Sequence, residues 1–189
     1  TTLFRSLDAL AEKLRRLVGD DAVRDRIRVE DLRSCGAALH AAEIGGKRLA
    51  SPEEVRAQLS VAAEAQGAGQ DLAFIAAERE IIVDGRDVRS AEAYRTVSRA
   101  GRRVRLAEGR REALWAVFDD MRGRLGAAGL MTPSDMFFDL ARHFADRDAP
   151  FSAVVVDEAQ DISAGELAFL AAIAGARPNG LFFAGDIGQ

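Results

Sequence analysis

The N-terminal segment has the spacing of an amphipathic helix. Its leucines recur at alternating steps of four and three residues, at Leu3, Leu7, Leu10, Leu14 and Leu17. We expect Thr1 or Thr2 to cap this helix, Gly19 to end it, and its leucine stripe to be buried. Residues 26–30 then alternate polar and apolar, which predicts a short strand, and residues 31–41 predict a helix.

The middle of the chain, residues 44–149, has helical periodicity with little strand character. Ser51 and Pro52 are a typical cap and first residue of one helix. A second helix is predicted from the apolar spacing of Leu114, Trp115, Phe118, Met121 and Leu125. A third, capped by Thr132 or Ser134, carries Met136, Phe137, Leu140 and Phe144. We expect these helices to bury one another.

The last part of the chain changes to strand, helix and strand. Ala153 to Val156 form an apolar, β-branched run without polar alternation, which predicts a parallel strand buried on both faces. Ser163 is expected to cap a helix over 164–175, with Leu167, Leu170, Ala171 and Ala174 on its inner face. A second apolar run, residues 181–184, completes the unit. This order predicts an α/β fold with a parallel sheet.

Polar residues follow each predicted strand. Asp157 and Glu158 come directly after the first strand, and Gly185 and Asp186 follow the second. Ligands of open parallel sheets bind beyond the carboxyl ends of the strands, so adjacent carboxylates there predict a site for Mg²⁺ and a nucleotide. Asp157 would hold the metal, and Glu158 would orient or deprotonate an attacking water. The alternative is a buried strand followed by ordinary surface acids.

These two segments carry a family resemblance. VVVDEAQD followed by LFFAGDIGQ resembles motifs II and III of the UvrD/Rep-like superfamily 1 DNA helicases. The resemblance implies a partial RecA-like P-loop NTPase domain, formed by residues 1–43 and 150–189, plus an all-helical subdomain inserted at 44–149. It implies ATP and Mg²⁺ as cofactors, with Asp157 on the metal and Glu158 as the catalytic base. It also implies that Gln160 and Gln189 sense the γ-phosphate and that Asp186 supports this relay.

The resemblance also implies contacts with DNA. TTLFRSLDAL is similar to motif Ia, which places Thr2 near a single strand, and Arg33 lies where the next DNA-contacting segment is expected. Residues 86–111 contain nine arginines and three acidic residues, a surplus of six positive charges. AYRTVSRAGRRVRL resembles a segment of a bacterial branch of the family, so Arg99, Arg102 and Arg103 are candidate phosphate contacts. The alternative is that these arginines brace the subdomain through acids such as Asp119 or Asp120.

Composition sets limits on these interpretations. The net charge of −4 gives no global attraction to nucleic acid, and no apolar run is long enough for a membrane span. A single cysteine, Cys35, is typical of a reducing cytoplasm. The sequence contains no G-x-x-x-x-G-K-[ST], the loop that cradles a triphosphate.

The functional expectation is a fragment of an ATP-dependent DNA helicase. By resemblance it would translocate 3′ to 5′ on single-stranded DNA and unwind duplex junctions together with the remainder of its parent chain. Because the triphosphate loop is absent, we expect the fragment alone to be inactive. The alternative is a non-catalytic DNA-binding or regulatory module derived from a helicase.

Overall fold

The computed structural model describes residues 2–68, 71–100 and 105–186, with side chains from residue 7 onward. Helices dominate an α/β architecture that has two small parallel sheets. The elements are α1 (Thr2–Leu17), α2 (Asp21–Arg24), α3 (Leu32–Glu43), β1 (Arg48–Leu49), α4 (Pro52–Ala65), α5 (Leu72–Glu78), the π-helix η1 (Arg79–Asp84), α6 (Ala91–Thr96), α7 (Glu108–Ala127), β2 (Leu130–Met131), α8 (Pro133–Phe144), β3 (Val154–Val156), the 3₁₀ helix η2 (Ala159–Asp161), α9 (Ala164–Ala174) and β4 (Leu181–Phe183).

Most predicted helices form where their capping residues stand. Ser51 and Glu54 make a capping box at the start of α4, and Ser163 and Glu166 make another at the start of α9. Thr132 caps α8 by accepting from a backbone N–H of its first turn. Such caps satisfy backbone groups that a helix end leaves without partners, which is why the sequence located these boundaries.

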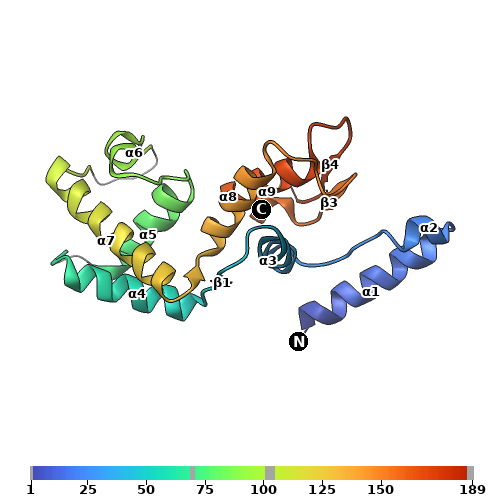
Figure 1. Ribbon diagram of the computed structural model, residues 1–189, viewed down its shortest axis with the longest axis horizontal. Coiled ribbons are helices and arrows are strands. Elements are labelled where there is room, and N and C mark those ends of the chain that lie inside the picture. The colour runs from blue at the N-terminus through green and yellow to red at the C-terminus, as the bar shows by residue number, and fades with distance from the viewer. Residues whose placement is uncertain (1, 69–70, 101–104, 187–189) are drawn as a thin grey trace.

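Two hydrophobic cores divide the chain into two lobes (Figure 1). The helical lobe, residues 50–130, contains α4, α5, η1, α6 and α7 around Leu59, Ile75 and Leu114. The sheet lobe contains α3, α8, α9, β3 and β4 around a core that includes Phe137 and Phe169. The backbone passes between the lobes at β1 and β2, which pair in parallel.

Helix α8 belongs to the sheet lobe. The sequence grouped it with the helical insertion, but its apolar stripe packs against α9 and α3. The rings of Phe137 and Phe169 lie 5.3 Å apart between their centroids. The two cores therefore meet between Leu130 and Met131 rather than near residue 149.

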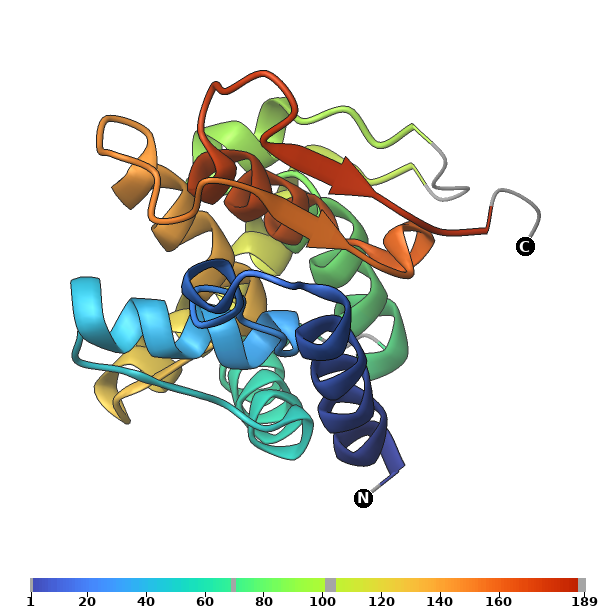
Figure 2. The same ribbon diagram turned by 90° about the vertical axis from the view of Figure 1, so that its right-hand side faces the viewer.

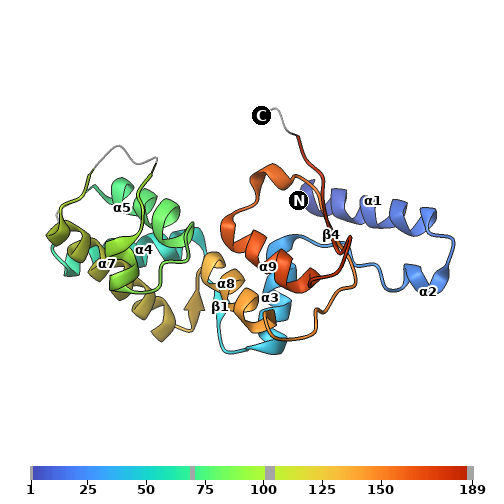
Figure 3. The same cartoon turned by 90° about the horizontal axis from the view of Figure 1, so that it is seen from above.

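The N-terminal helix lies at the far end of the molecule from the helical lobe (Figures 1 and 3). Its predicted extent is confirmed, but the prediction that its leucine stripe is buried is wrong, because Leu10 and Leu17 are exposed. The strand predicted at residues 26–30 is wrong. The N–H groups of Arg26 and Ile27 instead donate back to Val23 and Arg24, continuing the turn that follows α2.

Strands β3 and β4 lie side by side in parallel, connected by α9 (Figure 2). Val154 pairs with Leu181 and Val156 with Phe183. The prediction that β3 is buried on both faces is wrong, because Val155 is 73% exposed and Phe182 is 63% exposed. Alternate side chains of a strand point to opposite faces, and only the face toward α9 is covered by the described residues.

Helix α9 presents a different inner face from the predicted one. Phe169, Leu170, Ile173 and Ala174 are buried, whereas Leu167 is 49% exposed and Ala171 is exposed. The helix is apolar almost all round, so its periodicity did not specify which stripe faces the core. No helix in the described part of the chain is long and apolar enough to cross a membrane.

Candidate active site at the ends of two parallel strands

The two polar signatures lie beside each other at the carboxyl ends of β3 and β4. The Ala184 N–H donates to the Val156 carbonyl at 2.8 Å, and the Ala159 N–H donates to the Ala184 carbonyl at 2.9 Å. These backbone bonds extend the strand pairing into η2, which forms the turn after Asp157 and Glu158 (Figure 2). The parallel register therefore places the side chains after both strands at one edge of the sheet.

Gln160 connects the two signatures through both ends of its amide group. Its Nε2 donates to Glu158 Oε2 at 2.6 Å. Its Oε1 accepts from the Asp186 backbone N–H at 3.2 Å. The position of the Glu158 carboxylate is thus linked to the backbone that follows β4.

Glu158 occupies an unusual backbone conformation. Its φ of +53° lies in the left-handed region, which a residue with a side chain enters at a cost. The Glu158 N–H donates to Asp157 Oδ1 at 3.0 Å, and the Glu158 carbonyl accepts from Asp161 at 3.1 Å. This local bonding holds a sharp turn in which both carboxylates are exposed.

Gly185 stands where the turn makes a close approach to the segment after β4. A Cβ at this position would overlap Gln160 Oε1 and would lie 3.0 Å from the Ala159 nitrogen. The glycine of the second signature therefore makes room for the glutamine of the first. This steric dependence is a physical reason for the two motifs to occur together.

The turn exposes the carboxylate that the sequence predicts as a magnesium ligand. Mg²⁺ in nucleotide sites is held by one or two carboxylates, several waters and the phosphates of the ligand. The exposed Asp157 carboxylate fits that role. Within the described ranges, no three His, Cys, Asp or Glu side chains are grouped closely enough to hold a metal ion.

The structure places the other predicted site residues away from this turn or does not describe them. Arg33 is exposed in the first turn of α3. Thr2 begins α1, but its side chain is outside the described set, and Arg102, Arg103 and Gln189 lie outside the described residues. Arg99 lies in the helical lobe, whereas Asp157, Glu158, Gln160 and Asp186 lie in the sheet lobe.

Arg99 makes a buried ion pair that sequence reasoning missed. Its Nε and Nη2 donate to the two oxygens of Glu78 at 2.8 and 2.7 Å. The Tyr94 hydroxyl donates to Glu78 Oε1 at 3.0 Å. The side chains of Arg99 and Glu78 are 6% and 0% exposed. For Arg99 this geometry favours the bracing interpretation, although the acid is Glu78 rather than Asp119 or Asp120.

The Arg99–Glu78 pair shifts the pKa values of Arg99 and of the neighbouring Tyr94. The hydrogen bond to Glu78 raises the pKa of Arg99, and burial with the nearby Glu78 carboxylate raises the pKa of Tyr94. The Tyr94 ring packs against Trp115 with 5.8 Å between centroids, so Trp115 is part of this packing. A signal for Glu78 existed in the sequence, since it follows the buried Ile75 by three residues on one helix face.

No protein-family model matches this chain, and no curated protein is recognisably similar to it.

Proposed function

We propose that this chain forms part of the ATPase domain of a superfamily 1 DNA helicase of the UvrD/Rep type. The observation that supports the proposal is the Gln160 bridge, which joins the Glu158 carboxylate to the backbone of Asp186. Surface acids that merely follow a strand have no reason to be tied to the end of the neighbouring strand. A site that transmits the state of a bound nucleotide from one motif to the other does have a reason for this connection.

The roles of the residues follow from their positions. Asp157 holds Mg²⁺ through its exposed carboxylate, and Glu158 orients or deprotonates the attacking water. When bound, Mg²⁺ and ATP supply the phosphoanhydride bond and the charge neutralisation that its cleavage needs. Gln160 fixes the Glu158 carboxylate in the turn when no nucleotide is bound. When Gln160 moves, Asp186, whose backbone N–H donates to Gln160, passes that movement on toward β4.

The grip on the triphosphate comes from outside these residues in this proposal. The 189-residue sequence has no glycine-rich loop with the G-x-x-x-x-G-K-[ST] pattern. The intact protein would therefore supply that loop, and the chain by itself would neither hydrolyse ATP nor unwind DNA. Contacts to single-stranded DNA by Thr2, Arg33, Arg102 and Arg103, with Gln189 at the γ-phosphate, rest on the resemblance.

The test measures DNA-stimulated ATP hydrolysis by the intact protein that contains this chain. We expect Glu158→Gln to lower turnover by roughly 10²- to 10⁴-fold, the usual effect of a positioned general base. Asp157→Ala should weaken the binding of magnesium nucleotide. The matched control is Asp161→Asn, an exposed carboxylate in the same turn, which should leave turnover close to that of the wild type.

Two outcomes would count against the proposal. Equal ATPase rates in wild type, Glu158→Gln and Asp157→Ala would remove the turn from the chemistry. A wild-type protein that binds single-stranded DNA without hydrolysing ATP would identify a non-catalytic module instead.

A further inference from the structure

A cluster of ion pairs crosses from the helical lobe to the sheet lobe. On one side is the loop after η1, which carries Asp87 and Arg89 on either side of Val88, a buried residue of the helical core. On the other side is α8, which carries Asp135 and Arg142. Because α8 packs in the sheet-lobe core, each bond between these two segments joins the lobes.

Each of these four side chains pairs with a side chain of the other segment. Arg89 donates to Asp87 in its own loop and to Asp135 of α8. Arg142 of α8 donates from Nη1 to Asp87 Oδ2 at 2.7 Å. The Thr132 hydroxyl also donates to Asp135 Oδ2 at 2.8 Å, which fixes that carboxylate at the start of α8.

The cluster is shielded from water more than an ordinary surface pair is. The Asp135 side chain is 12% exposed and that of Arg89 is 29% exposed. The Arg89 guanidinium also lies over the Phe138 ring, 5.5 Å from its centroid. Exposed pairs contribute little because water screens them, whereas partly buried and bidentate arrangements restrict geometry more strongly.

The loop is shaped to present its carboxylate to both arginines. Asp87 has a φ of +50°, in the left-handed region that aspartate tolerates better than most residues. This backbone turn allows one carboxylate to accept from Arg89 on one oxygen and from Arg142 on the other. A conformation that costs energy is thus retained at the contact between the lobes.

Two further contacts support this cluster: Arg122 of α7 lies 3.5 Å from Asp135, and the Ser134 hydroxyl donates to the Asp84 carbonyl at 3.4 Å. The backbone connection itself is short. β1 and β2 contribute two residues each, and their pairing runs Arg48 to Leu130 and Leu49 to Met131. A two-residue parallel pairing restrains rotation weakly, because it forms few ladder bonds. Orientation must therefore come from contacts beside the backbone connection.

We propose that Asp87, Arg89, Asp135 and Arg142 form an interlobe latch that fixes the orientation of the helical lobe on the sheet lobe. The latch acts near the candidate site through close packing. Arg89 covers Phe138, and a Cβ on Gly165 would lie 3.3 Å from the Phe138 ring. Gly165 is in the first turn of α9, the helix that follows η2. The inference does not depend on the proposed ATPase activity.

The test measures the distance between the lobes in the full chain by double electron–electron resonance. Spin labels would be attached at Glu64→Cys in α4 and Ala171→Cys in α9, both exposed positions, in a Cys35→Ala background. We expect a narrow distance distribution in the parent chain. The double variant Arg89→Gln, Arg142→Gln should shift or broaden it, because it removes the bonds from Arg89 to Asp135 and from Arg142 to Asp87.

Matched controls separate orientation from general loosening. Labels at Glu64→Cys and Gly123→Cys lie within the helical lobe, and their distribution should not change in the latch variant. Arg95→Gln removes ion pairs that lie entirely within the helical lobe, with Glu92 of α6 and Glu108 and Glu112 of α7, and it should leave the interlobe distribution unchanged. Arg89→Lys keeps the charge but loses the planar fork, so it should broaden the distribution less than Arg89→Gln does.

An unchanged interlobe distribution in a folded latch variant would overturn the proposal. Circular dichroism and thermal melting establish that the variant is folded. If the double variant does not fold, Arg89→Gln and Arg142→Gln are measured separately, because each removes one of the two arginine bonds between the segments. Unchanged distributions in both folded single variants would likewise exclude the latch.

Discussion

The buried pair of Arg99 and Glu78 gives the sharpest prediction about the basic segment. Replacing Arg99 by Ala would remove a charged, bidentate partner of the Glu78 carboxylate, which is 0% exposed. Removing one member of a buried ion pair costs about 3–5 kcal/mol, because the remaining charge loses the compensation that its burial requires. In a chain of this size each kcal/mol lowers the melting temperature by about 2–4 °C, so the loss should be roughly 6–20 °C.

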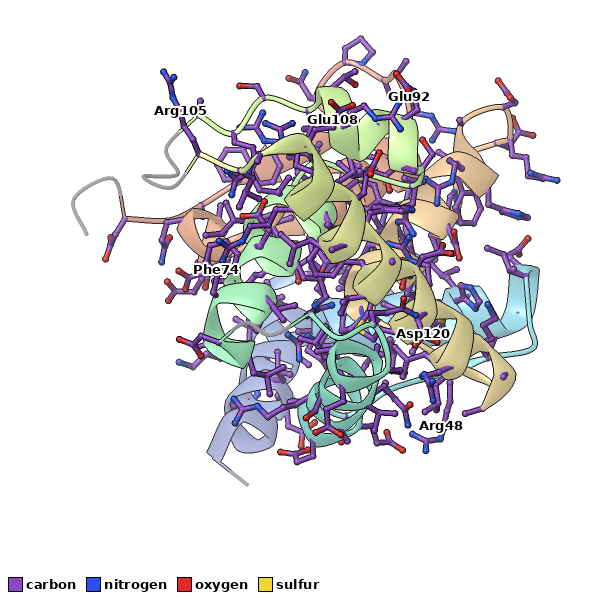
Figure 4. The ribbon with its side chains drawn as sticks, turned by 90° about the vertical axis from the view of Figure 1, so that its left-hand side faces the viewer. Arg48, Phe74, Glu92, Arg105, Glu108 and Asp120 are labelled. Atoms are coloured by element: carbon purple, nitrogen blue, oxygen red, sulfur yellow. The ribbon has the colours of Figure 1, made fainter. Side chains whose placement is uncertain are left out.

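The matched control comes from the same basic segment. Arg105 is exposed and points away from the helical lobe (Figure 4). Arg105→Ala should change the free energy of unfolding by less than about 0.5 kcal/mol, as surface substitutions usually do. Replacing both buried partners, in Glu78→Leu with Arg99→Met, should recover much of the stability, since apolar residues of similar volume often substitute for a buried pair without loss.

The assay combines urea unfolding of the chain with single-strand binding by the intact protein. For Arg99→Ala we expect a lower unfolding midpoint, with DNA affinity per folded molecule and its salt dependence unchanged. An unfolding midpoint equal to that of Arg105→Ala, together with weaker and less salt-dependent DNA binding, would refute the bracing role. It would show that Arg99 leaves Glu78 to contact phosphates.

Three further predictions concern single groups. Burial raises the pKa of Asp84 to about 6, above the value of about 3.9 for an unfolded chain, so its contribution to stability is present below pH 4 and is lost as the pH rises toward 6. Asp84→Asn should remove this loss, so a stability difference between variant and wild type that stays constant from pH 4 to 7 would contradict the assignment. Burial also raises the pKa of Cys35 to about 11, so a thiol reagent at pH 8 should modify it about 100-fold more slowly in the native chain than in urea, and equal rates would exclude this environment. Gly185→Ala should displace Gln160 and lower ATP turnover in the intact protein while the melting temperature changes little, whereas unaltered turnover would mean that the bridge is dispensable.

Local signals in the sequence predicted much of the fold. Ser51, Thr132 and Ser163 cap helices because each supplies an oxygen to backbone N–H groups a few residues away. These contacts depend on near neighbours in the chain, so their residue types are sufficient to predict them. The parallel pair of β3 and β4 follows from the same kind of reasoning, since one helix connects two short apolar runs.

Features that depend on distant partners were not predictable in the same way. Val155 has the residue type of a buried strand, but its exposure is decided by whether another element covers that face of the sheet. The assignment of α8 to a lobe likewise depends on α3 and α9, which are remote in sequence. Counting charges in residues 86–111 could not identify Glu78 as the partner of Arg99, because the acid lies outside that segment.

The strength of the bonds in the candidate site indicates which of them is able to change. The turn is anchored by backbone bonds from Ala159 and Ala184, which continue the strand pairing and do not involve the carboxylates. The bond from Gln160 to Glu158 is charge-assisted but exposed, so water competes with it and its net contribution is small. A ligand that attracts the Gln160 amide could therefore release Glu158 without unfolding the turn. Asp186 would then lose the acceptor of its backbone N–H, which makes the segment after β4 the first to respond.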